Sequence, residues 1–311
     1  MNKAEHLTNI MVERFIRAVE NGVDLVPVVA DSTSTAKITP FINAFPNRLV
    51  NVGIAEQTMV GCAAGLALGG KVAVTCNAAP FLVSRANEQV KVDVCYNNNN
   101  VKLFGLNAGA SYGPLASTHH SLDDISIMRG FGNIQIFAPS SPLECRQIID
   151  YAINYVGPIY IRLDGKELPE IHEEDYRFEP GKIDVLQKGE QIALIAMGST
   201  VYEIVSAAEL LAEKGMKVTV INVPSLRPCD TEALFTAVRD CQAVITVEEH
   251  NVNGGLGSLV AEVLAEQGAP IKLKRLGIAD GQYALAADRQ SMRKYHGIDA
   301  QSVLETALTL V

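Results

Sequence analysis

The sequence lacks several features that mark common functional classes. It has no run of Lys or Arg, and its formal net charge is −9. Nucleic-acid binding needs clustered positive charge, so no nucleic-acid partner is expected. The most apolar early stretch, residues 59–68, is too short and too rich in Gly and Ala to span a bilayer, and the N-terminus shows no apolar signal region. These absences predict a cytoplasmic protein with no membrane association.

Cysteine shows no functional pattern either. The six cysteines are scattered along the chain, and none forms a C-x-x-C pair. Neither a zinc site nor a redox motif is indicated, and reduced, mostly buried thiols are the simpler interpretation. No metal ligand is assigned to this chain.

The composition is that of a globular protein with a sizeable core. The chain has 311 residues, of which 48% are apolar and 20% charged, and this length favours two domains. Short β-branched runs alternate with helical patterns, such as the one at 84–95, which predicts a parallel sheet with helices on both faces. The strands predicted in the first part are 25–29, 49–52, 71–75, 101–106, 134–138 and 159–163.

A polar segment interrupts this alternation. Residues 165–189 contain two prolines and many charges, which favours a domain boundary. We therefore predict an α/β fold of two successive doubly wound domains, 1–168 and 190–311, joined by a linker at 169–189. The second set has predicted strands at 192–197, 218–223, 243–247 and 271–276, and helices near 201–214, 230–239, 255–266 and 299–310.

The most informative segment is Asn51-Val-Gly-Ile-Ala-Glu-Gln, where a predicted strand ends and a small-residue helix begins. Ligands of open α/β sheets bind beyond the carboxyl ends of strands, so Glu56 lies where ligand chemistry is expected. Position alone favours a simpler alternative, in which a glutamate in the first helical turn only complements the helix dipole.

This segment closely resembles the pyrimidine-domain motif of transketolases and deoxyxylulose-phosphate synthases. Further matching stretches follow in the family's order, and over the whole chain they resemble the separately encoded C-terminal half of transketolase. Several dispersed motifs in the correct order are more specific than any single one. The stretches are Asp31-Ser-Thr-Ser-Thr, Phe45-Pro-Asn-Arg, Arg85-Ala-Asn-Glu-Gln, Ser117-Thr-His-His-Ser-Leu-Asp-Asp, Gly157-Pro-Ile-Tyr-Ile-Arg and Glu248-Glu-His-Asn-Val-Asn-Gly-Gly.

The resemblance implies that the chain helps to bind thiamine diphosphate. Glu56 would hydrogen-bond the aminopyrimidine ring nitrogen and favour the imino tautomer that activates the thiazolium carbon. Ile54, in the same motif, is assigned to cofactor binding with it. Asp31 would lie near the thiazolium ring, with helix capping as its alternative. Phe81 would stack on the pyrimidine, with a place in the core as its alternative.

The resemblance also implies a sugar-phosphate substrate. His119 would contact the substrate and manage protons on its hydroxyls, a task that suits its near-neutral reference pKa. Arg162 would grip the phosphate, with a salt bridge at a strand end as its alternative. Thr35 matches a family serine near that phosphate and could equally be a cap.

Two positions depart from the family pattern. Asn107 stands where transketolases have His, and Leu115 stands where an Asp usually reads a sugar hydroxyl. Asparagine cannot shuttle a proton, and leucine cannot accept a hydrogen bond. Asn107 is kept as a candidate substrate contact, and the substrate is expected to differ from the usual linear pentose and hexose phosphates.

The sequence contains no Gly-Asp-Gly, the stretch with which this class holds Mg²⁺ on the cofactor's diphosphate. The resemblance therefore implies a separate N-terminal subunit that carries the diphosphate and Mg²⁺ site, and an α2β2 assembly. A glycine-rich loop at 254–257 could cradle an anion, but a structural role is the preferred interpretation.

We therefore expect the C-terminal subunit of a two-chain transketolase that moves a two-carbon ketol unit from a ketose phosphate to an aldose phosphate. The alternatives are an enzyme like deoxyxylulose-phosphate synthase or a 2-oxoacid dehydrogenase β subunit, and a non-catalytic scaffolding paralogue. The retained Glu56 favours catalysis, whereas Asn107 and Leu115 support the paralogue.

Overall fold

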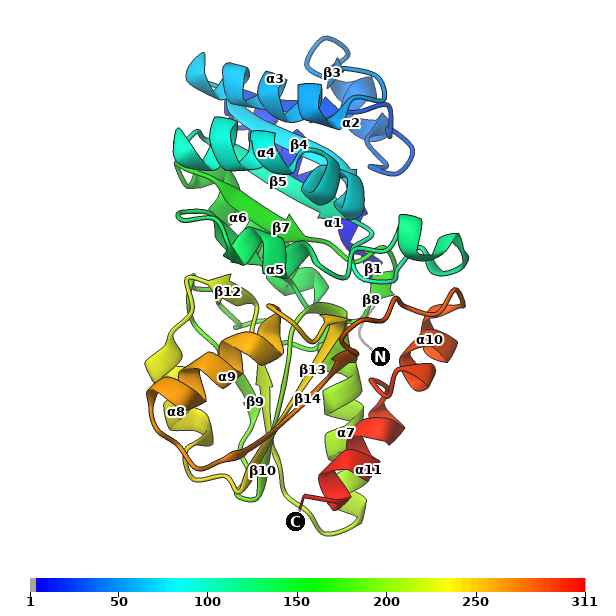
Figure 1. Cartoon of the computed structure of the whole chain (residues 1–311). Helices are drawn as coiled ribbons and strands as arrows, with labels where there is room; N and C mark the ends of the chain where they lie inside the picture. The colour runs from blue at the N-terminus through cyan, green and yellow to red at the C-terminus, as the bar shows by residue number, and fades with distance from the viewer. Residues whose placement is uncertain (1–3, 311) are drawn as a thin grey trace.

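The chain folds into two α/β units that meet along a broad junction. The computed structural model describes residues 4–310, and Figure 1 shows the N-terminal unit above and the C-terminal unit below. Each unit has a sheet with helices on both faces, so the predicted doubly wound α/β fold is confirmed. Within residues 4–310, no helix is both long and apolar enough to cross a bilayer.

Seven strands form the first sheet, in the order β12-β6-β7-β5-β4-β2-β3. All neighbours are parallel except β12 and β6. The bounds are β2 Leu25–Val29, β3 Val50–Asn51, β4 Val72–Ala78, β5 Val101–Leu106, β6 Gln135–Phe137, β7 Ile159–Arg162 and β12 Ser225–Arg227. All six strands predicted for this part are present, because most of them are buried apolar runs bounded by polar or turn residues.

Helices cover both faces of this sheet because their apolar stripes face it. One face carries α1 (Leu7–Glu20), α2 (Thr39–Ala44) and α6 (Pro142–Asn154). The other carries α3 (Glu56–Leu68), the helical stretch 81–96 with α4 (Asn87–Gln89), and α5 (Asp124–Arg129). The stretch 81–96 is longer than the predicted helix at 84–95 and has wide π-helical turns at 81–85 and 90–96, a form that is uncommon and often found near functional sites.

The second sheet has five strands in the order β14-β13-β10-β11-β9. Only β9 runs antiparallel to its neighbour. Helices α7 and α11 cover one face, and α8 and α9 cover the other. The bounds are β9 Asp184–Gln187, β10 Ile192–Ala196, β11 Thr219–Asn222, β13 Ala243–Asn251, β14 Lys272–Ile278, α7 Val201–Glu213, α8 Thr231–Val238, α9 Leu256–Glu266, α10 Arg289–Tyr295 and α11 Ala300–Leu308.

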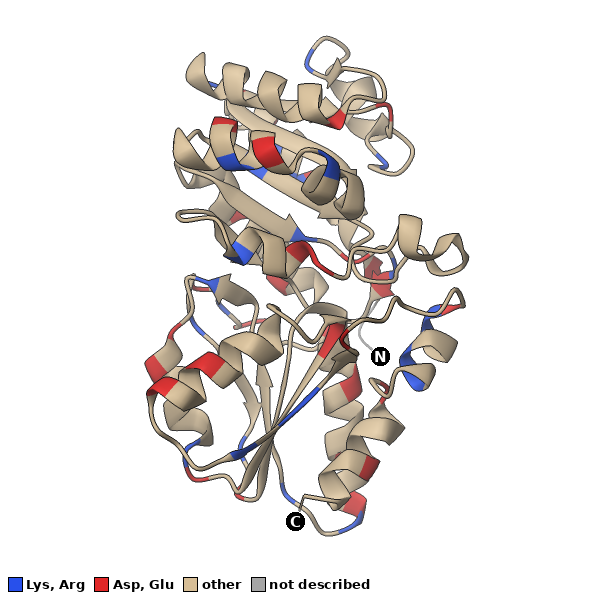
Figure 2. Ribbon diagram, viewed as in Figure 1, with Lys and Arg blue, Asp and Glu red and all other residues tan. Residues whose placement is uncertain are grey.

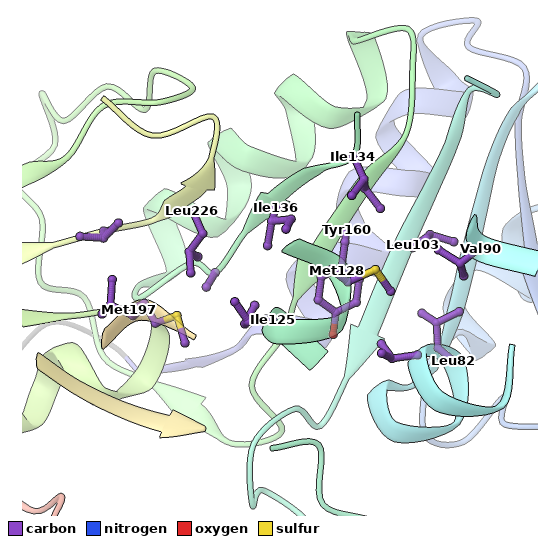
Figure 3. Packing of buried hydrophobic residues seen from close by; sticks show 14 of the residues in the cluster. Leu82, Val90, Leu103, Ile125, Met128, Ile134, Ile136, Tyr160, Met197 and Leu226 are labelled. Atoms are coloured by element: carbon purple, nitrogen blue, oxygen red, sulfur yellow. The ribbon is translucent and has the colours of Figure 1, made fainter. Parts of the chain in front are cut away.

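The two units share a sheet edge and a core, which the sequence did not predict. Strand β12 leaves the C-terminal unit and pairs antiparallel with β6, with Ser225 opposite Phe137, and so supplies partners for the unpaired backbone groups of an edge strand. Figure 3 shows that Leu226 and Met197 of the C-terminal unit lie in one apolar cluster with Ile125 and Ile136 of the N-terminal unit.

The glycine-rich loop at 254–257 has a structural role. The amides of Leu256 and Gly257 donate to the two carboxylate oxygens of Glu248, at 2.7 and 2.8 Å. A carboxylate from β13 therefore caps the start of α9, where an external anion could otherwise bind.

The polar segment between the units is bound to both of them. Its strand β8 (Glu167–Leu168) pairs with β1 (Glu5–His6), and its His172 lies buried beneath Tyr176, with ring centroids 3.9 Å apart. His172 Nδ1 lies 2.7 Å from the Oγ of Ser141, the N-cap of α6, and Nε2 lies 3.0 Å from Asp184 Oδ2 in β9. One imidazole therefore links the first unit to the second sheet.

Carboxylates around His172 favour its charged form. Burial alone would lower the pKa of His172, but hydrogen bonds with Asp184 and Glu170 and the nearby charge of Glu144 raise it to about 9. The buried carboxyl of Glu144 has its own pKa raised by burial. The protonated imidazole is thus the cation that balances these acids.

We predict that His172→Gln destabilises the protein mainly at low pH. A group whose pKa is raised on folding stabilises fully below its unfolded value, and this contribution is lost as pH rises through about 9. In urea unfolding, the variant should fall below the wild type by roughly 2 kcal/mol near pH 6, and the gap should narrow above about pH 9.

The matched control is His296→Gln, because burial lowers the pKa of His296. This control should show no extra loss at low pH. A wild-type to H172Q difference that stays constant across the pH range would contradict the assignment.

Candidate active site

Five of the residues singled out from the sequence follow the carboxyl ends of parallel strands. Asp31 follows β2, Ile54 and Glu56 follow β3, Phe81 follows β4, and Asn107 follows β5. Neighbouring parallel strands end at the same edge of a sheet, which is where α/β proteins bind ligands. The fold therefore collects these residues along one edge.

Glu56 is the most constrained residue on this edge. It begins α3, and its side chain is only 3% exposed. Asn77 Nδ2 donates to Glu56 Oε1 at 3.3 Å, and Arg85 Nη1 donates to Oε2 at 2.7 Å. Burial by itself would raise the pKa of Glu56, but the Arg85 hydrogen bond, a backbone amide and Asn77 hold that pKa below its usual value. Glu56 is thus a buried carboxylate kept ionised by one cation.

A chain of aromatic contacts connects Glu56 to His119. Arg85 Cζ lies 4.6 Å from the centroid of the Phe81 ring, a cation-π geometry. The Phe81 ring meets the His119 ring edge to face at 5.2 Å, and His119 meets Tyr112 in the same way at 5.4 Å. Glu56, Phe81 and His119, which lie far apart in the sequence, are therefore brought together.

Asn51 ties the Asp31 turn to the Glu56 turn. Its Oδ1 accepts the backbone N–H of Asp31 at 3.1 Å and that of Gly53 at 3.0 Å. Asp31 adopts a left-handed φ of 62°, which is uncommon for a residue other than glycine and is found in strained functional turns. Ile54 is 79% exposed beside this turn, and Thr35 lies half-buried in the loop before α2.

Arg162, the predicted phosphate contact, does not lie at the open edge. It is 7% exposed, and its Nε donates to Asp124 Oδ2 at 2.9 Å. Its Nη2 donates to the backbone oxygens of Ser121 and Glu249, at 3.3 and 2.8 Å. Tyr160 donates to the same Asp124 oxygen. Since these donors are committed inside the junction, the geometry favours the alternative role of a salt bridge at the strand end.

Leu115 lies in one long loop, and Asn107 lies just before it. Gly109 and Ser121 form an isolated antiparallel bridge, which closes a loop at 109–121 that also contains His119. Asn107 precedes this loop with a left-handed φ of 51°, and a β-carbon on Gly165 would overlap its Oδ1. Leu115 is 52% exposed on the loop.

Sequence reasoning missed three residues of this site: Asn77, Arg85 and Tyr112. Arg85 opens one of the family-like stretches, so it was visible, but nothing local shows that it pairs with Glu56. Asn77 lies inside a strand and Tyr112 in a loop, and only the fold brings them to Glu56 and His119.

The edge has the chemistry expected of a binding site for an aminopyrimidine ring. It offers a buried carboxylate acceptor at Glu56, an aromatic ring at Phe81 and an exposed apolar side chain at Ile54. Asn77 Oδ1 is buried and has no hydrogen-bond partner among residues 4–310. Figure 2 shows acidic and basic residues interspersed over both units rather than gathered into one cationic face. Over the same residues, no group of three His, Cys, Asp or Glu side chains is arranged to hold a metal ion.

These features fit the pyrimidine-binding domain of an enzyme family dependent on thiamine diphosphate. The chain belongs to the transketolase family: residues 7–170 match the transketolase pyrimidine binding domain, and residues 181–303 match the transketolase C-terminal domain.

Known relatives match the whole chain. It is 82% identical over 310 residues, covering 100% of both chains, to one subunit of the apulose-4-phosphate transketolase of Actinobacillus succinogenes. The corresponding subunit of Phocaeicola vulgatus is 37% identical, over 93% of this chain and 92% of that one. A solved split gene transketolase, described as an inactive beta4 tetramer, is 33% identical with a TM-score of 0.87, covering 100% of this chain and 98% of that one.

We predict that Arg85→Met raises the pKa of Glu56. The substitution leaves the carboxyl buried but removes the cation that holds it ionised. Carboxyl carbon NMR titration should show the Glu56 resonance moving to a higher midpoint, and Arg85→Lys should restore part of the difference.

The matched control is Arg48→Met, which breaks a surface ion pair with Asp24 and should leave the Glu56 titration unchanged. An unaltered Glu56 midpoint in R85M would refute this role for Arg85.

Proposed function

We propose that this chain is the subunit of a two-chain transketolase that carries the cofactor-activating glutamate. The enzyme transfers a two-carbon ketol unit from a ketose phosphate to an aldose phosphate. One observation carries the proposal: the Glu56 carboxylate lies buried and ionised at the carboxyl edge of a parallel sheet, joined through Arg85 and Phe81 to His119. The names of the two bacterial relatives support apulose 4-phosphate as the donor.

Each residue on the edge has a defined task in this proposal. Thiamine diphosphate, when bound, supplies the carbon nucleophile that takes up the two-carbon unit. Glu56 holds a proton at the aminopyrimidine ring nitrogen, and Asn77 orients the Glu56 carboxylate through its amide. Phe81 and Ile54 would present apolar surface to the ring, and Asp31 would lie near the thiazolium.

His119 handles the protons of the sugar. Its Nδ1 lies 2.9 Å from Thr118 Oγ1, which supports Nε2 as the nitrogen that would exchange a proton with a substrate hydroxyl. Thr35 is proposed to contact the phosphate. Arg162 is not proposed as a phosphate ligand, because its guanidinium is bound inside the junction.

A second chain completes the site. The diphosphate and Mg²⁺ are held by an N-terminal subunit, since the sequence contains no Gly-Asp-Gly. An isoleucine that is 79% exposed beside Glu56 fits an edge covered by a partner. The naming of the relatives as subunits and the beta4 assembly of the split homologue support a two-chain enzyme that also self-associates, which we propose to be α2β2.

Asn107 and Leu115 adapt the site to its donor. Apulose has a branched carbon skeleton, so the hydroxyl pattern read in linear sugars is absent. An uncharged amide and an apolar side chain replace the family's His and Asp at these places, and Leu115 is exposed on the loop that carries His119. Substitution of groups that read hydroxyls changes which sugar is accepted, because unpaired polar groups in a site are costly.

We predict that Glu56→Gln abolishes ketol transfer in the reconstituted two-chain complex. Glutamine keeps the shape of the side chain but cannot carry the charge, so kcat should fall by roughly 10²- to 10⁴-fold. The control Glu88→Gln changes an exposed glutamate and should leave kcat unchanged. Full turnover by E56Q would leave only the scaffolding role.

We also predict that activity requires the partner. Ketol transfer from apulose 4-phosphate, followed by chromatography of the sugar phosphates, should appear only with this chain, the N-terminal subunit, Mg²⁺ and thiamine diphosphate together. Linear pentulose and hexulose phosphates should be poorer donors. Turnover by this chain alone would refute the two-chain assignment.

A further inference from the structure

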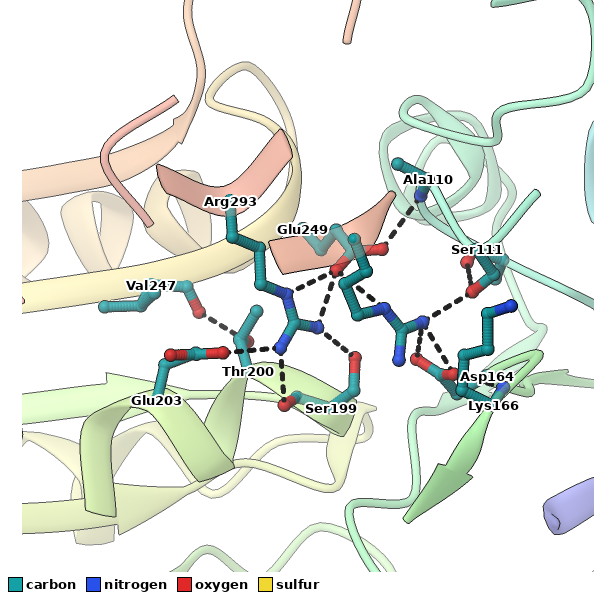
Figure 4. A network of polar contacts seen from close by, with 12 residues as sticks. Ala110, Ser111, Asp164, Lys166, Ser199, Thr200, Glu203, Val247, Glu249 and Arg293 are labelled. Carbon is teal, nitrogen blue, oxygen red and sulfur yellow. Dashed lines mark hydrogen bonds and ion pairs between the residues drawn. The ribbon is translucent and has the colours of Figure 1, made fainter. Parts of the chain in front are cut away.

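The loop at 109–121 carries His119 and Leu115, yet it is held by the C-terminal unit. Figure 4 shows Glu249 of β13 reaching across the junction to Ala110. The amide of Ala110 donates to Glu249 Oε1 at 2.9 Å. Gly109 has a left-handed φ of 66°, which favours glycine, and a β-carbon on it would lie 2.6 Å from the same oxygen. The start of the loop is therefore fitted to a residue of the other unit.

A second group of contacts holds the next residues of the loop. Arg289 of α10 donates from Nη2 to Ser111 Oγ at 2.8 Å and to both carboxylate oxygens of Asp164 at 2.7 Å. Two residues on, Gly113 has a φ of 55°, and a β-carbon there would lie 2.9 Å from the backbone oxygen of Ala287. The segment that leads into α10 thus packs directly against the loop.

The far end of the loop is fixed at the same place. Arg162 donates from Nη2 to the backbone oxygens of Ser121 and Glu249. Since Ser121 also pairs with Gly109, both ends of the loop meet at Glu249. The portion between them, which contains His119, projects towards the cofactor edge and touches Phe81.

The charged side chains that hold the loop are buried, and each depends on the others for charge compensation. Glu249 is 2% exposed and Asp164 is 8% exposed. Burial would raise the pKa values of both carboxyls. Arg293 and Arg289 instead hold the pKa of Glu249 below its usual value, and Arg289 does the same for the pKa of Asp164. Removing one partner from such a cluster leaves an uncompensated buried charge, so the contacts are retained together.

We propose that the C-terminal unit positions the donor sugar by holding the 109–121 loop, with Glu249 and Arg289 as positioning residues. This inference rests on the proposed ketol transfer, and it gives the C-terminal unit a role in substrate selection beyond assembly. The two residues act through the loop and do not touch the substrate.

The test compares two ways of loosening the junction. Ser111→Ala removes only the hydroxyl that links the loop to Arg289, and Arg289→Met removes the hydrogen bonds of Arg289 to both Ser111 and Asp164. The matched control is Arg129→Met, because Arg129 also crosses the junction, to the backbone oxygen of Gly254 and to Glu262, without contacting the loop.

Steady-state kinetics of the two-chain complex with apulose 4-phosphate give the first readout. S111A and R289M should raise the donor KM by about tenfold, while the concentration of thiamine diphosphate needed for half activity stays at its wild-type value. Arg289→Lys should recover part of the loss, and R129M should behave as wild type. Equal effects of R129M and R289M on donor KM would mean that any loosening of the junction impairs donor binding, and would overturn the proposal.

Hydrogen exchange of the same complexes gives a readout that does not depend on turnover. Amides of 109–121 should exchange faster in S111A and R289M, whereas α3 should remain protected. Unchanged exchange in this loop would overturn the proposal even if activity fell, and S111A decides the matter if R289M does not fold. If the wild-type complex shows no ketol transfer but the loop exchange responds, the proposed function fails and only the mechanical contact stands.

Discussion

The buried carboxylate of Glu249 is the interaction on which the arrangement of the two units depends. An isolated carboxylate at 2% exposure would be very costly. It is satisfied by Arg293 of its own unit, which donates from Nε at 2.7 Å, and by the Ala110 amide of the other unit. Because the compensation comes from both sides, the units are fixed in one relation rather than joined by a flexible linker.

The same reasoning distinguishes two of the buried glutamates, Glu56 and Glu249. Glu56 and Glu249 both lie beside arginines, but Arg85 is half exposed whereas Arg293 is buried. A cation that reaches solvent can be displaced when a ligand or partner covers the edge. Glu56 can therefore exchange its partner for a ligand, whereas Glu249 keeps its partners inside the junction.

Much of the fold could be predicted from the sequence, because buried strands are local patterns. The run 101–106 is a strand with the predicted bounds, and 25–29 is another. The π-helical turns at 81–96 and strand β12 could not be predicted, since the first depends on packing against α3 and the second on an edge 88 residues away in sequence, from Phe137 to Ser225.

The site divides in the same way. The sequence by itself placed Glu56 and Asp31 at strand ends and, through the missing Gly-Asp-Gly, indicated an incomplete cofactor site. Only the tertiary structure decided that Arg85 pairs with Glu56 and that the Arg162 guanidinium is bound inside the junction. The reason is physical: a strand end is a local property, whereas the partner of a charge is chosen by whichever side chains share its low-dielectric surroundings.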